Sequence, residues 1–339
     1  MNLSQGVDFV KKSLKLNPVA FFVLARKRLM YYWQRLVKPQ RKVSYGSENI
    51  DKTFYVIGLD HPPMTGLTWI IFLVFLHIIY ARKHKYIPIV DMQNFKNKFL
   101  EEKLLYKENA WEYFFKQPWG YTLKDIAKSK NIILSSPCSF GPGIESIGPY
   151  ILSKPWRQKL LYFRKLFHEY IKPAPKAQKY FDQEYNTFIK GRKKVLGVLC
   201  RGTDRLLSKP SGHRIQPLPK IVLAKAQEVM RRQKCSHIYL ATEDQDIYEL
   251  FRREFGRKLI VNEQKRLSQN KIPKGKLIHQ FDTMSTKERY DMNLAYLSSL
   301  YILSKCPCFI GGCTGGTIAI HLMTKGFEYE YTWDLGVYS

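Results

Sequence analysis

Along the chain, short apolar runs alternate with longer amphipathic segments. The first half has three strand-like runs, at 53–59 (TFYVIGL), 86–92 (YIPIVDM) and 131–135 (NIILS). In the second half, apolar runs alternate with helical patterns. The apolar runs lie at 195–200, 237–242, 258–262 and 308–312. The helical patterns lie at 221–233, 246–256 and 289–306, and a last one begins at Gly316. Strands that take turns with helices are typical of parallel sheets. The pattern therefore predicts an α/β protein with two Rossmann-like, doubly wound parallel-sheet domains that face a cleft.

The most apolar stretch, residues 67–80 (LTWIIFLVFLHIIY), follows the first predicted strand. It is shorter than the roughly 20 residues that a membrane-spanning helix needs, and it contains His77. We therefore expect a buried helix between two strands. The length of 339 residues suits two domains, which we place at 49–170 and 171–339 after an N-terminal segment at 1–48.

Charge distinguishes both the whole chain and its N-terminal segment. The 56 lysines and arginines against 28 acidic residues give a formal net charge of +28, which predicts an anionic partner. Residues 1–48 interleave basic with aromatic and aliphatic side chains, as amphipathic helices on anionic membranes do. The alternative is a helix that packs on the body of the protein. Because no secretory signal pattern opens the sequence, we expect a cytoplasmic protein that is peripheral on the inner face of the cytoplasmic membrane.

Composition and cysteine content narrow the class further. The chain is 45% hydrophobic and 25% charged, which is typical of a globular protein and excludes a disordered or collagen-like chain. Its six cysteines are few and irregularly spaced, so we expect buried free thiols in a reducing compartment. Cys306, Cys308 and Cys313 have no histidine at metal-ligand spacing, and we expect no metal site there.

The first candidate motif follows the predicted strand at 195–200. Arg201, Thr203 and Asp204 lie in the sequence RGTD, directly after this strand. Open α/β sheets bind ligands at the carboxyl ends of their strands, and a guanidinium there can give two parallel N–H donors to a diphosphate. Asp204 could hold Arg201 in place. The alternative is an ordinary surface pair of charges at a strand end.

Two more strand ends bring polar groups to the same edge of the sheet. Thr242 and Glu243 end the strand at 237–242, and together with Asp244 they could simply cap the next helix. The segment 308–319 (CFIGGCTGGTIA) joins a strand to a helix through a turn rich in Gly and Thr. Such a turn predicts a phosphate cradle of backbone amides, hydroxyl donors and a helix N-terminus. Its candidate residues are Gly312, Thr314, Gly315, Gly316 and Thr317.

The order of these motifs resembles the carboxyl half of the fucosyltransferase superfamily, whose members have the two-domain GT-B fold. By this resemblance Arg201 binds the β-phosphate of a GDP-sugar, and residues 314–316 receive phosphate oxygens. Two positions differ from the family pattern, because Leu199 stands in place of a histidine and Gly202 in place of a second arginine. A base-contacting aspartate of the family falls near Ser298 and Ser299.

The same resemblance implies that the loop after the first strand faces the cleft. This loop contains Asp60 and His61, either of which could take the proton from an acceptor hydroxyl. Glu145, in the sequence FGPGIES, is the other candidate base. A turn dictated by the two prolines after His61 is an equally good interpretation of that loop. His213 and Gln216 follow the Arg201 loop and contact donor or acceptor, unless they form a plain turn before a helix.

Taken together, the resemblance implies a glycosyltransferase, specifically a fucosyltransferase-like hexosyltransferase of bacterial capsule or O-antigen synthesis. It would move fucose or another sugar from a GDP-linked donor to a polysaccharide or lipid-linked oligosaccharide, with inversion and without a metal or other cofactor. Its partners would be the nucleotide sugar, the acceptor and the anionic inner membrane surface, with no nucleic acid. Two alternatives are a nucleic-acid-binding protein, for which no zinc, helix-turn-helix or RNP signature is found, and a non-catalytic nucleotide-sugar-binding subunit of a capsule assembly complex.

Overall fold

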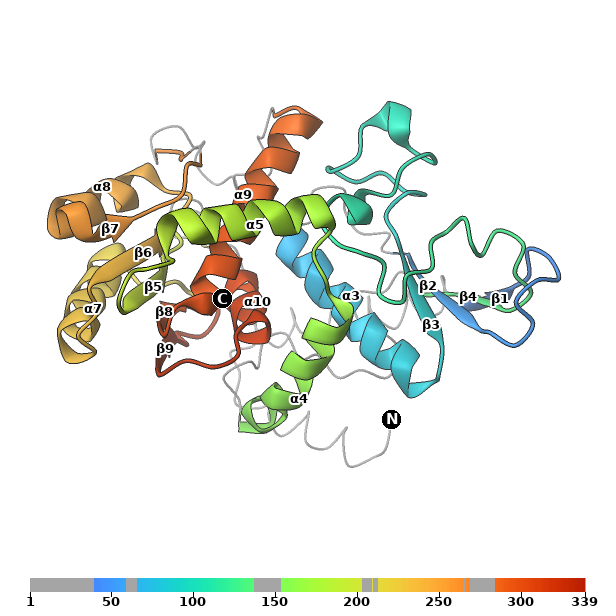
Figure 1. Ribbon diagram of the computed structural model, residues 1–339, viewed down its shortest axis with the longest axis horizontal. Helices are drawn as coiled ribbons and strands as arrows, with labels where there is room; N and C mark the ends of the chain where they lie inside the picture. The colour runs from blue at the N-terminus through green and yellow to red at the C-terminus, as the bar shows by residue number, and fades with distance from the viewer. Residues whose placement is uncertain are drawn as a thin grey trace.

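The computed structural model describes residues 40–58, 66–136, 154–202, 209, 213–264, 266–268 and 284–338. Two β-sheets lie at opposite ends of the molecule, and helices fill the space between them (Figure 1). The first sheet has four strands and the second has five. This arrangement confirms the predicted α/β class with two sheets.

The first sheet consists of β1 (Arg41–Val43), β2 (Phe54–Gly58), β3 (Ile87–Asp91) and β4 (Ile132–Leu134). The strand order is β1-β4-β2-β3; β2 is parallel to β3 and β4, and β1 is an antiparallel edge strand. The three strands predicted in the first half are confirmed. Strand β1 was not predicted, because three residues with two adjacent basic side chains show no alternation of polar and apolar positions. Since β1 falls within residues 1–48, the described part of that segment is built into the first sheet.

Helix α3 (Leu67–Lys83) connects β2 to β3 and is the buried helix that the apolar run predicts. Leucine, isoleucine and phenylalanine side chains on several sides of the helix are buried against the sheet and neighbouring helices. His77 lies among them, fully buried, and its Nδ1 shares a 2.9 Å hydrogen bond with the hydroxyl of Tyr55 on β2. This bond offsets the cost of burying an imidazole. Nowhere in the described ranges is a helix long and apolar enough to cross a membrane.

Two buried side-chain amides complete the open edge of β3. Gln117 accepts from the Val90 N–H at 2.8 Å and donates to the Val90 carbonyl at 2.9 Å. Asn109 accepts from the Met92 N–H at 3.1 Å and donates to the same carbonyl at 2.7 Å. These amides replace the backbone partners of a further strand, and they hold the connection that contains the short 3₁₀ helices η1 (Glu102–Leu104) and η2 (Ala110–Tyr113).

The second sheet is entirely parallel, with the strand order β7-β6-β5-β8-β9. The four strands predicted in the second half are confirmed; β9 is additional, and its alternating aromatic and polar residues did not stand out from the polar C-terminal stretch. The strand bounds are β5 Val195–Leu199, β6 His237–Ala241, β7 Leu259–Ile260, β8 Cys308–Gly312 and β9 Tyr329–Trp333.

Helices cover both faces of this sheet. On one face, apolar residues of α7 and α8 pack on Leu196, Val198 and Ile310, and on the other, residues of α5, α9 and α10 pack on Leu199 and Phe309. Alternate strand residues thus enter two separate layers, as in a doubly wound sheet. The bounds are α5 Pro175–Phe188, α7 Pro219–Arg232, α8 Gln245–Phe255, η4 Gly256–Lys258, α9 Thr286–Lys305 and α10 Gly315–Met323.

A single hydrophobic core extends from the first sheet to the second. It includes Tyr55 of β2, Phe75 of α3 and Phe309 of β8. Helix α10 packs against α3 and against α4 (Lys154–Tyr170), and α5 packs against α9. Arg164 of α4 also donates from Nε to the carbonyl of His321 in α10 at 2.8 Å. The two sheets are therefore joined into one packed body.

The described cysteines are free thiols, as the sequence predicts. Cys200, Cys306, Cys308 and Cys313 are buried, and Cys235 is partly buried. Burial raises the pKa of the Cys200 and Cys306 thiols, which keeps them protonated and unreactive at neutral pH. Cys138 lies outside the described residues.

Candidate active site

Arg201 lies at the carboxyl edge of the second sheet, two residues after the buried central strand β5. Its Nε donates to Oε1 of Glu243 at 3.0 Å, and the two side chains are 23% and 27% exposed. The charges are therefore partly shielded from water, and the bond to Nε fixes the direction of the guanidinium. Glu243 is thus a partner of Arg201, and the predicted residues Thr203 and Asp204 lie outside the described residues.

The other polar residues after β6 serve the local fold. Asp244 is fully buried and caps α8, accepting from the N–H groups of Asp246 and Ile247 at 2.8 and 3.0 Å. Thr242 is 2% exposed, and its hydroxyl accepts from the Asp244 N–H at 3.2 Å. The capping interpretation thus holds for Asp244, whereas Thr242, a predicted ligand residue, is turned into the protein. Only Glu243 of this group reaches the edge beside Arg201.

Asp244 and Asp246 have a spacing that the sequence interpretation overlooked. Two carboxylates separated by one residue after a strand are a common arrangement for holding a divalent cation. Here the Asp244 carboxylate is used as the helix cap. Within the described ranges, no group of three or more histidine, cysteine or carboxylate side chains could hold a metal ion.

Gly202 explains one departure from the family pattern. A Cβ atom at this position would lie 2.5 Å from Oδ2 of Asp244 and would also collide with Ile247. Both neighbours are buried, so a shift of either side chain would disturb the surrounding packing. With this backbone, a side chain at position 202 would collide with the Asp244 cap of α8.

The Gly/Thr turn connects β8 to α10, immediately beside Arg201 because β5 and β8 are paired. Thr314 caps the helix by accepting from the Thr317 N–H at 3.2 Å. Thr317 is fully buried, and its hydroxyl donates to the Gly312 carbonyl, so this predicted donor is already used inside the turn. No acceptor among the described residues reaches the N–H groups of Gly315 and Gly316. These two amides, at the positive end of a helix dipole, are the part of the turn that suits an anion.

The glycines of the turn are explained partly by internal packing. A Cβ at Gly312 would collide with Oε1 of Gln216 and lie 3.0 Å from Pro217. Gln216 is itself buried and donates to the Cys313 carbonyl at 3.1 Å, which makes it a clamp on the turn and not a ligand-facing residue. At Gly316 a Cβ would lie 2.5 Å from the Tyr296 hydroxyl.

Gly315 faces helix α3. A Cβ there would lie 3.1 Å from Oγ1 of Thr68, in the first turn of α3. The beginnings of α3 and α10 therefore meet at the junction of the two sheets. The predicted bases Asp60, His61 and Glu145 lie outside the described residues, on segments that begin where β2 and β4 end. His213 is described, and its carbonyl accepts from the Tyr338 N–H at 2.9 Å, which joins the Arg201 loop to the C-terminal stretch.

The proposed base-contacting region near Ser298 and Ser299 lies in the interior. Both serines are fully buried in α9, and Ser299 Oγ accepts from Nδ2 of Asn262 at 2.9 Å and donates to the Ala295 carbonyl at 3.1 Å. Asn262 follows β7 and is 1% exposed. These positions therefore form a polar layer beneath the carboxyl edge of the sheet.

Among the comparisons with known proteins, only the comparison with solved structures finds proteins that are similar to this chain. No family model matches the chain, and no curated protein matches it. The fucosyltransferase NodZ from Bradyrhizobium is 15% identical, with 80% of this chain and 94% of that chain covered at a TM-score of 0.47. A mutant of Arabidopsis thaliana FUT1 in complex with GDP is 10% identical, with 94% and 80% covered and a TM-score of 0.48. POFUT1 in complex with GDP-fucose is 11% identical, with 85% and 99% covered and a TM-score of 0.43.

Proposed function

We propose that this chain is a glycosyltransferase that binds a nucleotide-diphosphate sugar at the carboxyl edge of its second sheet. The observation that carries the proposal is the oriented Arg201 guanidinium beside the N–H groups of Gly315 and Gly316, which no acceptor among the described residues reaches. A fixed guanidinium and a helix N-terminus are complementary to two linked phosphates. Because α3 begins at the same place, the first domain can supply the acceptor side.

The proposed reaction inverts the anomeric carbon and needs no metal. A base of the first domain, Asp60, His61 or Glu145, takes the proton of the acceptor hydroxyl, whose oxygen attacks the anomeric carbon. The bond from that carbon to the β-phosphate oxygen breaks, and the nucleoside diphosphate leaves. Arg201 and the α10 amides stabilise the negative charge that develops on the departing diphosphate. By the motif resemblance, we infer a GDP-linked donor, with fucose as the first sugar to test.

The donor class is tested by saturation-transfer NMR with a panel of nucleotide sugars. We expect saturation of the nucleotide and sugar protons of GDP-sugars, competed by GDP, and transfer to a polysaccharide or lipid-linked oligosaccharide of a bacterial surface. Binding without transfer to any such acceptor would favour a non-catalytic nucleotide-sugar-binding subunit. Absence of saturation across the whole panel would contradict the proposed function.

Glu243→Gln is expected to weaken binding of GDP about tenfold, because the neutral amide no longer orients the Arg201 guanidinium. Isothermal titration calorimetry on the single variants and the double variant with Arg201→Lys checks the mechanism. If Glu243 acts only through Arg201, the second substitution adds little to the first. Additive losses would show that Glu243 acts independently of Arg201.

Turnover is expected to survive EDTA. Arg201 and the N-terminus of α10 supply the positive charge that a divalent cation would otherwise bring to a diphosphate. The measurement is the initial rate of sugar transfer with and without chelator. An enzyme that EDTA inactivates and manganese restores would require a metal-dependent mechanism and would contradict this prediction.

We also propose that residues 1–48 hold the protein on the anionic inner surface of the cytoplasmic membrane. The full chain is expected to sediment with vesicles that contain phosphatidylglycerol and to be released by salt, since the attraction is electrostatic. Because β1 belongs to the first sheet, the matched deletion ends at residue 39. The shortened chain is expected to stay mostly in the supernatant, and equal sedimentation of both chains would contradict the role of this segment.

A further inference from the structure

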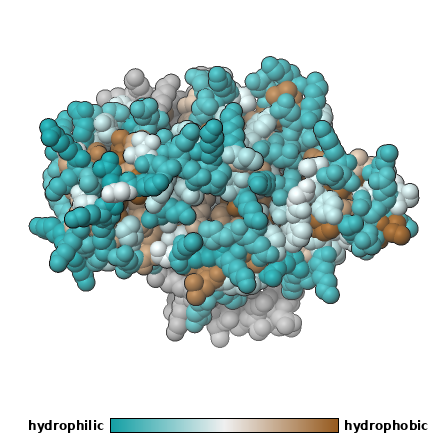
Figure 2. Space-filling view, viewed as in Figure 1, coloured by the Kyte–Doolittle hydropathy of each residue, from teal (hydrophilic) through white to brown (hydrophobic). Residues whose placement is uncertain are grey.

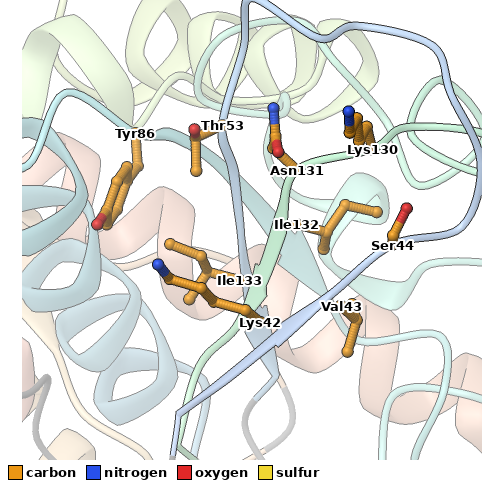
Figure 3. Close-up of a pocket in the computed structure, with 9 residues that line it drawn as sticks. All are labelled: Lys42, Val43, Ser44, Thr53, Tyr86, Lys130, Asn131, Ile132 and Ile133. Atoms are coloured by element: carbon orange, nitrogen blue, oxygen red, sulfur yellow. The ribbon is translucent and has the colours of Figure 1, made fainter.

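An open groove lies at the amino edge of the first sheet, the edge opposite to the candidate active site. Its volume is about 430 Å³. It is bordered by β1 and by the beginnings of β2, β3 and β4, which are adjacent because these three strands are parallel. Its lining consists of Lys42, Val43, Ser44, Thr53, Tyr86, Lys130, Asn131, Ile132 and Ile133 (Figure 3). Since nucleotide ligands of α/β sheets bind at the carboxyl edge, this groove has no part in the proposed transfer reaction.

The groove combines cations and neutral donors above an apolar floor. Lys42 comes from β1 and Lys130 from the turn before β4, and both are exposed. No carboxylate of a described residue forms an ion pair with either ammonium group. In Figure 3 the polar ends of Lys130, Asn131 and Thr53 lie toward the top of the view, whereas Lys42 extends away from Lys130, on the other side of β4, toward Tyr86. The two ammonium groups therefore suit separate phosphate groups that lie on one surface.

The surface around the groove has the same sign of charge. The loops that enter this edge, residues 40–53, 82–86 and 124–131, contain nine lysines and arginines and three acidic residues. Of these acids, Asp51 lies 3.6 Å from Lys52, and Asp125 accepts from the backbone and hydroxyl of Thr122. Tyr45 and Ile50 are 52% and 68% exposed in the same loops. Figure 2 shows a small hydrophobic area among hydrophilic side chains at the end of the molecule where β1 lies in Figure 1.

Chain connectivity favours a membrane as the source of the phosphate. Residues 1–39 carry eight basic residues and one acidic residue among many aromatic and aliphatic side chains, and they enter the folded protein at Gln40, directly before β1. Residues 1–39 and the basic loops around the groove are thereby attached to the same, amino edge of the first sheet. A lipid surface presents many phosphates in one plane, which matches a broad basic face better than a single soluble phosphate does. Exposed Tyr45 and Ile50 suit the boundary between headgroups and acyl chains.

We propose that Lys42 and Lys130, on either side of this groove, bind headgroup phosphates of anionic phospholipids, so that the amino edge of the first sheet rests on the membrane. This inference rests on the proposed membrane association and adds to it a second, folded contact surface. It places the candidate active site on the side of the sheet that faces away from the lipid.

The test compares sedimentation of full-length proteins with phosphatidylglycerol vesicles over a range of salt concentrations. Lys42→Glu combined with Lys130→Glu is expected to weaken partition at least thirtyfold, because two attractive charges are removed and two repulsive ones are added. The matched control is Lys179→Glu combined with Lys258→Glu, two exposed lysines of the second domain, with the same change of net charge. The control is expected to change partition less than threefold. Circular dichroism checks that both variants are folded.

Several outcomes would overturn the inference. If the full chain does not bind anionic vesicles at all, the membrane association itself fails; if it binds and both double variants lose affinity equally, only the groove assignment fails. Equal binding to phosphatidylcholine vesicles would exclude recognition of an anionic headgroup. Inorganic phosphate that binds the full chain without vesicles, through Lys42 and Lys130 and as tightly, would identify a soluble phosphate as the ligand. GDP binding in the Lys42/Lys130 variant is expected to equal that of the unmodified protein.

Discussion

Arg201→Lys is expected to lower the rate of sugar transfer by two to three orders of magnitude without changing the stability of the fold. Lysine keeps the charge but offers a single point donor, whereas the arginine fork gives parallel donors to a diphosphate. Losing a donor that acts on charge developed in the transition state costs about 3 to 4 kcal/mol. The loss is expected mainly in kcat, measured with saturating donor and acceptor, and thermal unfolding checks stability.

The control for this variant is Arg252→Lys. Arg252 also bonds from Nε to a glutamate, Oε2 of Glu249 at 3.1 Å, but it lies on the exposed surface of α8. We expect near-normal turnover for this variant. Near-normal turnover of Arg201→Lys, or a loss that merely follows unfolding, would mean that the RGTD segment is an ordinary surface turn and that the donor site lies elsewhere.

Gly202→Ala is expected to destabilise the protein by about 2 to 3 kcal/mol and to reduce transfer activity in the molecules that remain folded. The added methyl group would collide with Asp244 and Ile247, and moving Asp244 would also disturb the cap of α8. Because Gly202 adjoins Arg201, relief of the collision would displace the guanidinium from Glu243. Chemical denaturation and steady-state kinetics at a temperature where the variant is folded measure the two effects.

Gly58→Ala is the matched control for this substitution. Gly58 also follows a buried strand segment at a carboxyl edge, but a Cβ there would meet no atom within 4 Å. We expect a change of about 0.5 kcal/mol or less in the free energy of unfolding. A stability loss at Gly58 as large as that at Gly202 would show that the packing of Gly202 on Asp244 is not what makes glycine necessary.

Much of the fold could be predicted from the sequence because its strands are buried on both faces. Runs such as those at 195–200 and 308–312 are continuously apolar, and the amphipathic segments between them mark the helices. Two edge strands, β1 and β9, could not be found in this way, since each has one partner strand and few fully buried side chains. Between the two groups of strands lie helices α4 and α5, separated by a bend that includes Pro173.

The candidate site was predicted at the level of strand ends, but the roles of single side chains were not. The sequence places Arg201, Glu243 and Gly315 at one edge, because parallel strands bring their carboxyl ends together. The sequence cannot show which hydroxyl groups form hydrogen bonds within the protein instead of facing a ligand. The hydroxyls of Thr242 and Thr317 are of this kind, because both are buried and bonded to the backbone. Nor could the sequence show that Gln216, sixteen residues after Cys200, closes over the turn after β8, because this contact depends on tertiary packing.

The continuous core that joins β2, α3, α10 and β8 limits how far the two halves of this protein can separate. Parting them would expose the apolar side chains that α3 and α10 bury against each other, and burial is worth about 25 cal/mol per Å². Exposing roughly 400 Å² would therefore cost about 10 kcal/mol, as much as the whole free energy of folding of a typical domain. Wide hinge opening is therefore expected to be too costly for this protein.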